Sequence, residues 1–265
     1  GMTGRSYFGR GASPVPVGRA GPWVDAELAR DLLRVSTPLM ARRVAEGLIV
    51  FPLLWVAATF GPLIVAALEV GRRVAALLGS FTWGFSIAAS TLVGKRLGAG
   101  EEALATDYAR SIIGLSAGVY VVASLAVVLA AELIARVFVT DPAAVAATTT
   151  FIIVSALAAI PMGIDGSVTG SLRGGGDTKW PFWASVVGLY GFALPAALLG
   201  LLPAVGVAGL YAALLLERIV PAVLNALRFR SNRWQAVSRR YRPPTPGAGA
   251  LQESNPRAGA RDPIH

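Results

Sequence analysis

The chain has 265 residues, of which 54% are hydrophobic and only 15% are charged, with a formal net charge of +9. A soluble domain typically carries about 25% charged residues, so this composition indicates a protein of the lipid bilayer. The absence of cysteine excludes disulfides, iron–sulfur clusters and thiolate zinc sites, and the single histidine, His265, leaves no buried imidazole for histidine-dependent catalysis. We therefore expect neither an enzymatic activity nor a cofactor.

Both ends of the chain differ in composition from the apolar region between them. Residues 1–27 are rich in Gly, Pro and Arg and lack the continuous apolar segment of a signal peptide. This composition predicts a flexible linker. Residues 235–265 have the composition of a disordered tail. The membrane-embedded region is then expected over residues 28–234. Because the chain starts with Gly1, a fragment of a longer protein and a half-size protein are both open interpretations.

Six apolar segments are each long enough to cross a bilayer, which takes about 20 helical residues. They lie near residues 37–59, 62–94, 104–131, 143–171, 180–202 and 206–228. The second and fourth segments are longer than one span, which predicts tilt or extension into the interface. The sequence therefore predicts an all-α integral membrane protein with six transmembrane helices.

Basic residues are divided unevenly between the connections. The connections at residues 60–62, 132–142 and 202–206 contain a single cation, Arg136, whereas the remaining connections and both terminal segments are rich in Lys and Arg. Cytoplasmic loops of membrane proteins collect Lys and Arg. We therefore expect both termini in the cytoplasm, and the same bias explains the net positive charge without a nucleic-acid partner.

The first predicted span begins with three charged residues, in the stretch MARRVAEGLIVFPLLW at residues 40–55. A charged group near the centre of a membrane helix costs roughly 2.5–3.5 kcal/mol on insertion scales. Arg42 and Arg43 precede Glu46 by four and three residues, so both arginines can lie on the helical face of the glutamate. The cluster can thus neutralise itself as a structural ion pair.

The second predicted span carries the reverse pattern, Glu69 followed by Arg72 and Arg73. The tight connection at residues 60–62 makes the first two helices antiparallel neighbours. Counted from that connection, Glu46 and Arg73 differ in depth by about one helical turn. An ion pair across the two helices, from Glu46 to Arg72 or Arg73, is therefore a second way to place these charges.

Later spans carry further ionisable residues. Asp165 lies in PMGIDGSVTGSLRG (residues 161–174), eight residues before Arg173 and well inside the fourth span. An intramembrane carboxylate is a functional-site hypothesis by default, and an aspartate inside a helix requires a polar partner. Glu217 and Arg218 lie in the last span, and we interpret them as an interhelical bridge in preference to a substrate site.

Two glycine-rich connections, TLVGKRLGAG (residues 91–100) and GSLRGGGDTKWP (residues 170–181), occur in this order about 80 residues apart. As a pair they resemble the turns after the second and fourth helices of a six-helix half in the multidrug and toxic compound extrusion (MATE) family. The ending LERIVPAVLNALRFRSNRW (residues 216–234) is similar to the end of the family's last helix. The resemblance covers roughly residues 28–234. It implies the second, C-terminal lobe of a twelve-helix transporter, with residues 1–27 as the loop between lobes.

The resemblance implies a secondary antiporter of the plasma membrane that exports organic cations and drugs in exchange for H⁺ or Na⁺ by alternating access. Glu46 follows Pro38 by eight residues, a spacing at which some MATE transporters carry a glutamate in the first helix of the second lobe. The resemblance thus implies that Glu46 is a cation-coupling carboxylate. Asp165 is offset by about one turn from an aspartate of some family members, and it is the second candidate for binding H⁺ or Na⁺.

A single lobe supplies half of a substrate cavity between lobes. We therefore expect a complementary six-helix lobe, provided by a separate chain, a missing N-terminal half or a second copy of this chain. One alternative function is a lipid-linked oligosaccharide flippase of the same superfamily, which a strongly cationic cavity would favour. Another is a non-transporting membrane subunit or truncated fragment.

Overall fold

The structure of the protein is a computed structural model that describes residues 33, 36–37, 40–41 and 43–235. Several expectations concern residues outside this part of the chain. They are the linker at residues 1–27, the tail beyond residue 235, the position of Pro38 and the role of Arg42.

Every regular element of the described part is a helix. In chain order the elements are α2 (Val50–Thr59), α3 (Pro62–Gly98), α4 (Glu102–Leu129), α5 (Ala131–Phe138), α6 (Pro142–Gly174), α7 (Lys179–Val186), the π-helix η1 (Val187–Ala193), α8 (Leu194–Leu199) and α9 (Ala208–Arg230). Residues 43–48 are also helical and are separated from α2 by a turn at Ile49. The prediction of an all-α membrane protein is confirmed.

Five helical segments are long and apolar enough to cross a membrane: α3, α4, α6, the continuous unit α7–η1–α8, and α9. They correspond to the last five of the six predicted spans, and the full length of the first span stays a prediction. The third span was placed about two residues too far along the chain, because α4 ends at Leu129 and α5 begins a separate helix at Ala131. The fifth span contains seven residues of π-helix, which its apolar pattern did not indicate.

Local sequence signals explain where the long helices begin. Pro62 and Pro142 occupy the first turns of α3 and α6, where the missing N–H of proline removes no helical hydrogen bond. The Asp141 side chain accepts a hydrogen bond from the Ala144 backbone N–H at 2.9 Å and so caps α6. Before α3, Gly61 has a φ of 98°, a conformation that favours glycine.

The two glycine-rich connections turn at residues with positive φ. Gly100 has a φ of 85° directly after α3, and Gly176 has a φ of 84° after α6. Side chains with a Cβ rarely adopt this conformation. Glycine is therefore required at one position in each connection that resembles the family.

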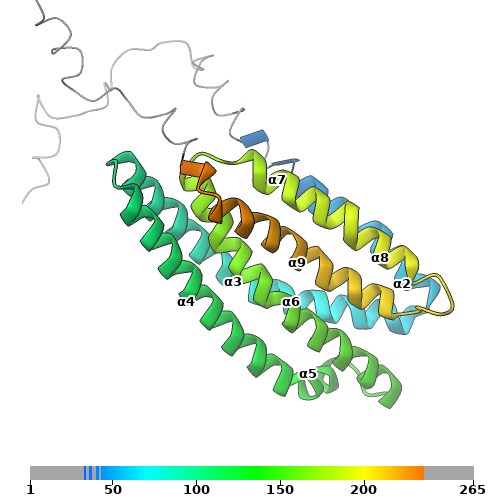
Figure 1. Cartoon of the computed structure of the whole chain (residues 1–265). Helices are drawn as coiled ribbons and strands as arrows, with labels where there is room; N and C mark the ends of the chain where they lie inside the picture. The colour runs from blue at the N-terminus through cyan, green and yellow to red at the C-terminus, as the bar shows by residue number, and fades with distance from the viewer. Residues whose placement is uncertain (1–32, 34–35, 38–39, 42, 236–265) are drawn as a thin grey trace, which may run out of the picture.

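Helix α6 lies at the centre of the bundle and packs against α3, α4, α5 and α9. Helix α9 in turn packs against α7, η1 and α8, and Figure 1 shows it between α6 and the α7–α8 unit. Helix α2 packs against α3, α8 and α9. The largest cluster of buried apolar side chains joins α2, the start of α3, α6, η1, α8 and α9.

A seam of small residues joins α3 and α6. Three glycines of α6, spaced four residues apart, face three hydroxyl residues of α3 with the same spacing; we call these glycines the glycine ladder. Its members are Gly166, Gly170 and Gly174, opposite Thr82, Ser86 and Ser90. A Cβ atom at Gly174 would lie 2.7 Å from the Ser90 carbonyl oxygen, and one at Gly170 would overlap the backbone of Ser86. Small residues with this spacing allow membrane helices to approach closely.

We predict opposite effects from two glycine-to-alanine substitutions. Gly170→Ala inserts a methyl group against backbone atoms that cannot rotate away, and overpacking of this kind costs about 1–3 kcal/mol. At Gly118 of α4, nothing lies within 4 Å of the added Cβ, and Gly118→Ala should stabilise the helix by up to about 1 kcal/mol. Thermal unfolding followed by tryptophan fluorescence measures both. A Gly170→Ala protein as stable as the unsubstituted chain would contradict the close packing.

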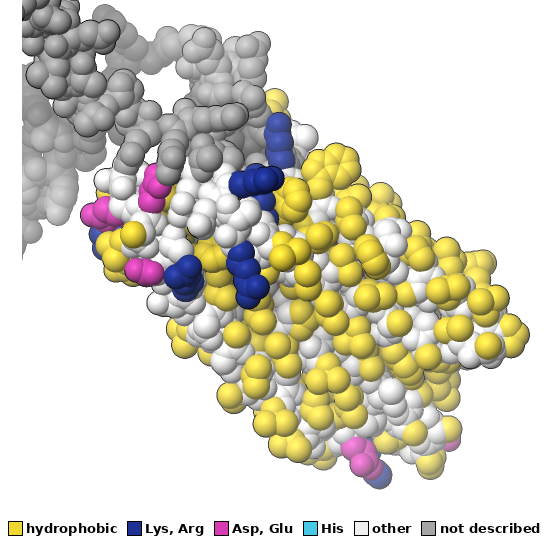
Figure 2. All heavy atoms as spheres, in the orientation of Figure 1, with side chains coloured by type: hydrophobic (Ala, Val, Ile, Leu, Met, Phe, Trp, Pro, Cys, Tyr) yellow, Lys and Arg dark blue, Asp and Glu magenta, His cyan; other side chains and the backbone are white. Residues whose placement is uncertain are grey.

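Basic side chains gather at one end of the bundle. The last turns of α3, α6 and α9 contain Lys95, Arg96, Arg173, Arg228 and Arg230. On the face drawn in Figure 2, most of the Lys and Arg side chains lie near the end where α3, α6 and α9 finish, and apolar side chains cover most of the remainder. The distribution agrees with the charge bias of the sequence.

Candidate functional site

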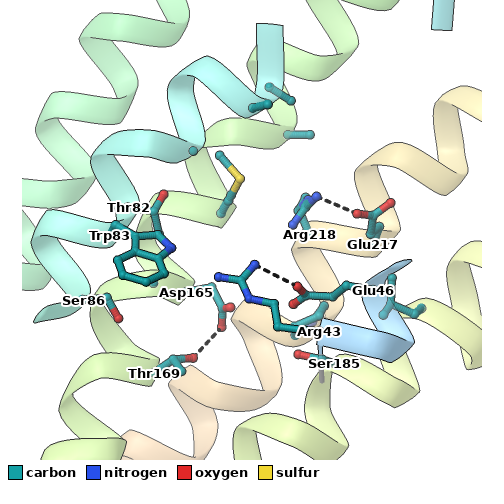
Figure 3. A pocket seen from close by; sticks show the side chains of 18 of the residues that line it. Arg43, Glu46, Thr82, Trp83, Ser86, Asp165, Thr169, Ser185, Glu217 and Arg218 are labelled. Carbon is teal, nitrogen blue, oxygen red and sulfur yellow. Dashed lines mark hydrogen bonds and ion pairs between the residues drawn. The ribbon is translucent and has the colours of Figure 1, made fainter. Parts of the chain in front are cut away.

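A cavity of about 1080 Å³ opens among the helical residues 43–48, α3, α6, the α7–η1 segment and α9. Much of its wall is apolar, with Trp83, Met162 and Leu214 among the lining residues. Its ionisable lining residues are Arg43, Glu46, Arg72, Asp165, Arg173, Glu217 and Arg218. These residues come from four helical segments, and Figure 3 shows Arg43, Glu46, Asp165, Glu217 and Arg218 around one space. The cavity is large enough for a drug-sized molecule.

Glu46 lies on the wall of this cavity, where Arg43 forms an ion pair with it at 3.4 Å between Nη1 and Oε2. The backbone next to Glu46 is anchored to another helix, because the Tyr190 hydroxyl donates a hydrogen bond to the Ala45 carbonyl oxygen at 2.9 Å. Tyr190 belongs to the π-helix η1. The fold thus fixes the depth of Glu46 relative to the fifth span.

The charges of α3 are arranged differently from the predicted cross-helix pair. Arg72 lies on the cavity wall with Glu46, but its recorded ion pair is with Glu69 of its own helix, at 3.6 Å between Nε and Oε1. Arg73 is exposed and does not line the cavity. The sequence predicted that Glu69, Arg72 and Arg73 of α3 take part in a charge network with Glu46. Of these three residues, Arg72 lines the cavity, and Glu69 and Arg73 do not.

Asp165 is buried in α6 and has a polar partner on α9. The Asn225 side-chain Nδ2 donates a hydrogen bond to Asp165 Oδ1 at 2.7 Å, and the Thr169 hydroxyl donates a longer one at 3.4 Å. Asn225 is fully buried, and its Nδ2 also lies 3.3 Å from the Thr169 hydroxyl. Sequence reasoning missed Asn225, although a lone amide inside an apolar span is itself a sign of an interhelical hydrogen bond.

Glu217 and Arg218 form an ion pair with each other, at 2.7 Å between Oε1 and Nη2. The pair lies within α9 and does not bridge two helices as the sequence interpretation expected. Glu217 is only 8% exposed, whereas the Arg218 side chain is 37% exposed. Figure 3 shows this pair across the cavity from Trp83 and separate from the pair of Arg43 with Glu46.

The GGGDTKW connection is fastened to the last helix by a buried ion pair. Arg228 Nε lies 2.8 Å from Asp177 Oδ2, and its guanidinium stacks over the Trp180 ring at 5.1 Å from the centroid. The Trp180 indole N–H donates to the Leu224 carbonyl oxygen at 3.3 Å. Arg173, which directly precedes this connection, donates to the Ser86 hydroxyl on α3. These contacts give the motif a structural role between α3, α6 and α9.

A bundle of helices long enough to span a membrane, arranged around a cavity with charged side chains on its wall, defines a multi-pass α-helical membrane protein with an internal cavity. The chain belongs to the MatE family, whose model matches residues 38–199.

Individual relatives agree with this assignment. The chain is 30% identical over 210 residues to the probable multidrug resistance protein NorM of Rhodopseudomonas palustris, covering 77% of this chain and 44% of the relative. Among solved structures, it resembles the eukaryotic MATE transporter AtDTX14 with a TM-score of 0.69 and 20% identity, covering 82% of this chain and 49% of the other.

An outward-facing multidrug resistance MATE family transporter of the MOP superfamily gives a TM-score of 0.68 at 21% identity, covering 83% of this chain and 49% of the other. At these identities the structural likeness establishes the fold. The chain spans about half the length of the relatives that it matches.

Proposed function

We propose that the chain is the second lobe of a MATE-type secondary antiporter that exports organic cations and drugs by alternating access. The observation that carries the proposal is the cavity of about 1080 Å³, which has carboxylates on its wall inside a bundle of membrane-spanning length. The family of the chain supports transport, and no nucleotide-binding motif suggests another source of energy. An ion gradient is therefore the proposed driving force.

The proposed coupling groups are Glu46 and Asp165, which would exchange H⁺ or Na⁺ against the substrate without any other cofactor. Both carboxylates lie on the cavity wall, and each has a polar neighbour that can respond to its charge. An ion pair such as that of Glu46 with Arg43 can also act as a switch, because a cation that binds the carboxylate competes with the arginine.

The proposed assembly contains a complementary six-helix lobe. The length of the chain relative to its relatives supports this view, with the lobe supplied by a separate chain, an N-terminal half or a second copy. The basic end formed by the last turns of α3, α6 and α9 supports a plasma-membrane orientation with both termini in the cytoplasm.

The charge of the cavity favours this reading over an oligosaccharide flippase. A strongly cationic cavity would favour a flippase, whereas three of the seven ionisable residues on the described wall are carboxylates. A non-transporting subunit is the remaining alternative, and gradient-driven transport would exclude it.

Transport by reconstituted vesicles tests the proposal. Vesicles containing the whole chain are loaded with ethidium and exposed to an inward H⁺ gradient or an inward Na⁺ gradient. We expect dye efflux under one gradient and its loss when nigericin or monensin collapses that gradient. Efflux that is equally fast without a gradient would contradict antiport. Absence of efflux under both gradients would exclude an assembly made of this chain alone.

A further inference from the structure

The short helix α5 lies at the end of the bundle where α4 finishes, as Figure 1 shows. Helix α4 contains 28 residues and is therefore about 42 Å long at about 1.5 Å per residue. A bilayer with its headgroups is about 40–45 Å thick. Because α4 begins beside the basic end of the bundle, its length carries the chain to the headgroup region of the opposite surface, where α5 begins.

One face of α5 packs on the bundle, and a second face is charged. Ala131 and Ala135 are buried in a cluster of apolar side chains from α3, α5 and α6. Glu132 and Arg136, about 100° further around the helix, form an exposed ion pair. Both charged residues border an open hollow of about 380 Å³ whose lining also includes Thr140. This second face suits contact with water.

The third face of α5 is apolar and exposed. Leu133 and Val137 each follow a charged residue by one position, and they are 70% and 76% exposed. On α4 the exposed residues Val122, Leu125 and Leu129 form a row with three- and four-residue spacing, which lies on one side of a helix. Leu133 and Val137 continue the four-residue spacing past the break between the two helices. The apolar row of a helix of spanning length therefore extends onto α5.

We propose that α5 is an interfacial helix whose apolar face lies on phospholipid at the bilayer surface opposite the basic end. Leu133 and Val137 enter the boundary between headgroups and acyl chains, and the pair of Glu132 with Arg136 faces water. Amphipathic helices of this kind lie in the plane of the interface with their apolar side chains about 5–10 Å deep. Protein, water and lipid meet only along the rim of a membrane protein at the bilayer surface, and the three faces of α5 match these three surroundings.

The contact with lipid gives α5 a role in the bundle. Only residues 139–141 separate it from α6, the helix that packs against α3, α4, α5 and α9. An interfacial α5 therefore holds the start of this central helix at a fixed depth in the bilayer. The inference goes beyond the proposed function and does not depend on transport.

Single cysteines test this arrangement, because the chain contains none of its own. Glu132→Cys and Leu133→Cys are a matched pair of neighbouring positions that are both exposed. Each cysteine is labelled with the fluorophore bimane, and the whole chain is placed in nanodiscs of phosphatidylcholine. Quenching by iodide in the water is then compared with quenching by a doxyl group attached to the lipid chain near its headgroup.

We expect the label at position 133 to lose most of its fluorescence to the lipid quencher and little to iodide. The label at position 132 should behave in the opposite way, so that the ratio of lipid to aqueous quenching differs several-fold between the two neighbours. Leu115→Cys, an exposed position in the middle of α4, is the reference for lipid contact. A doxyl group near the end of the lipid chain should quench its label more than the shallow doxyl group does.

Three results would overturn the inference. Equal quenching by iodide at positions 132 and 133 would place both faces in water. Equal quenching by lipid at both would mean that the whole helix is submerged. A label at position 133 that neither agent quenches would show that protein covers the apolar face, as a second copy or a complementary lobe would.

A second pair of positions keeps the test independent of one substitution. Arg136→Cys and Val137→Cys present the same two faces one turn later, and they replace the first pair if size-exclusion chromatography shows that Leu133→Cys does not fold. The quenching ratios should again differ several-fold. Because no measurement here involves a substrate or a gradient, failure of this inference leaves the proposed transport function untouched, and failure of transport leaves the position of α5 untouched.

Discussion

Glu46→Gln is expected to reduce gradient-driven export to the background of empty vesicles while the protein still inserts and folds. Glutamine has nearly the shape of glutamate but can neither release a proton nor offer a negative charge to Na⁺. The substitution also leaves Arg43 without the carboxylate that lies 3.4 Å away. Dye efflux from vesicles under H⁺ and Na⁺ gradients measures the loss, with protein content quantified in the same vesicles.

Glu69→Gln is the matched control. Glu69 also has an arginine three residues away on its helix, at 3.6 Å, but it does not line the cavity. Its substitution should leave transport close to that of the unsubstituted chain. If Glu46→Gln transports normally in a competent assembly, the coupling role is wrong. Loss of folding together with transport would show that the ion pair of Glu46 with Arg43 is mainly structural.

Asp177→Asn is expected to lower the free energy of unfolding by about 3–5 kcal/mol, the usual cost of removing one partner from a buried ion pair. The Asp177 side chain is 7% exposed and that of Arg228 is 19% exposed, so water compensates Arg228 poorly after the substitution. The connection between α6 and α7 would also lose its attachment to α9. Because the chain contains six tryptophans, tryptophan fluorescence during thermal unfolding is a suitable measurement.

The same change at an exposed pair provides the comparison. Glu132 and Arg136 form an ion pair at 2.7 Å, close to the 2.8 Å of the buried pair, but their side chains are 63% and 66% exposed. Exposed pairs contribute about 0–1 kcal/mol, so Glu132→Gln should change stability little. Equal effects of the two substitutions would mean that burial of Asp177 does not strengthen its pair.

The sequence predicted the long helices well because their ends carry strong local signals. Pro62 and Pro142 mark the starts of α3 and α6, and the glycine-rich connections mark their ends. The two motifs also identified the family, since each combines a required glycine with charged residues at fixed positions. Helix boundaries were predicted less accurately where the chain stayed apolar, as at the break between Leu129 and Ala131.

The cavity was predicted less completely, because its partners come from distant helices. The sequence identified Glu46 and Asp165 as charged residues in apolar surroundings, but spacing along one helix cannot show which groups face them. Asn225 is 60 residues from Asp165 in the chain, and Tyr190 is 145 residues from Ala45. The ion pairs of Arg72 with Glu69 and of Glu217 with Arg218 are local, but the sequence alone could not show that they form in preference to pairs between helices.

The glycine ladder has a mechanical consequence. Thr82, Ser86 and Ser90 lie against Gly166, Gly170 and Gly174 at a spacing of one helical turn, so a slide of less than a full turn would drive a side chain into backbone. Helices α3 and α6 are therefore expected to move as one unit, which carries the cavity-lining residues Trp83 of α3 and Asp165 of α6. In the proposed transport cycle, a change in cavity shape would then come from movement of α9 and the helical residues 43–48 relative to this unit.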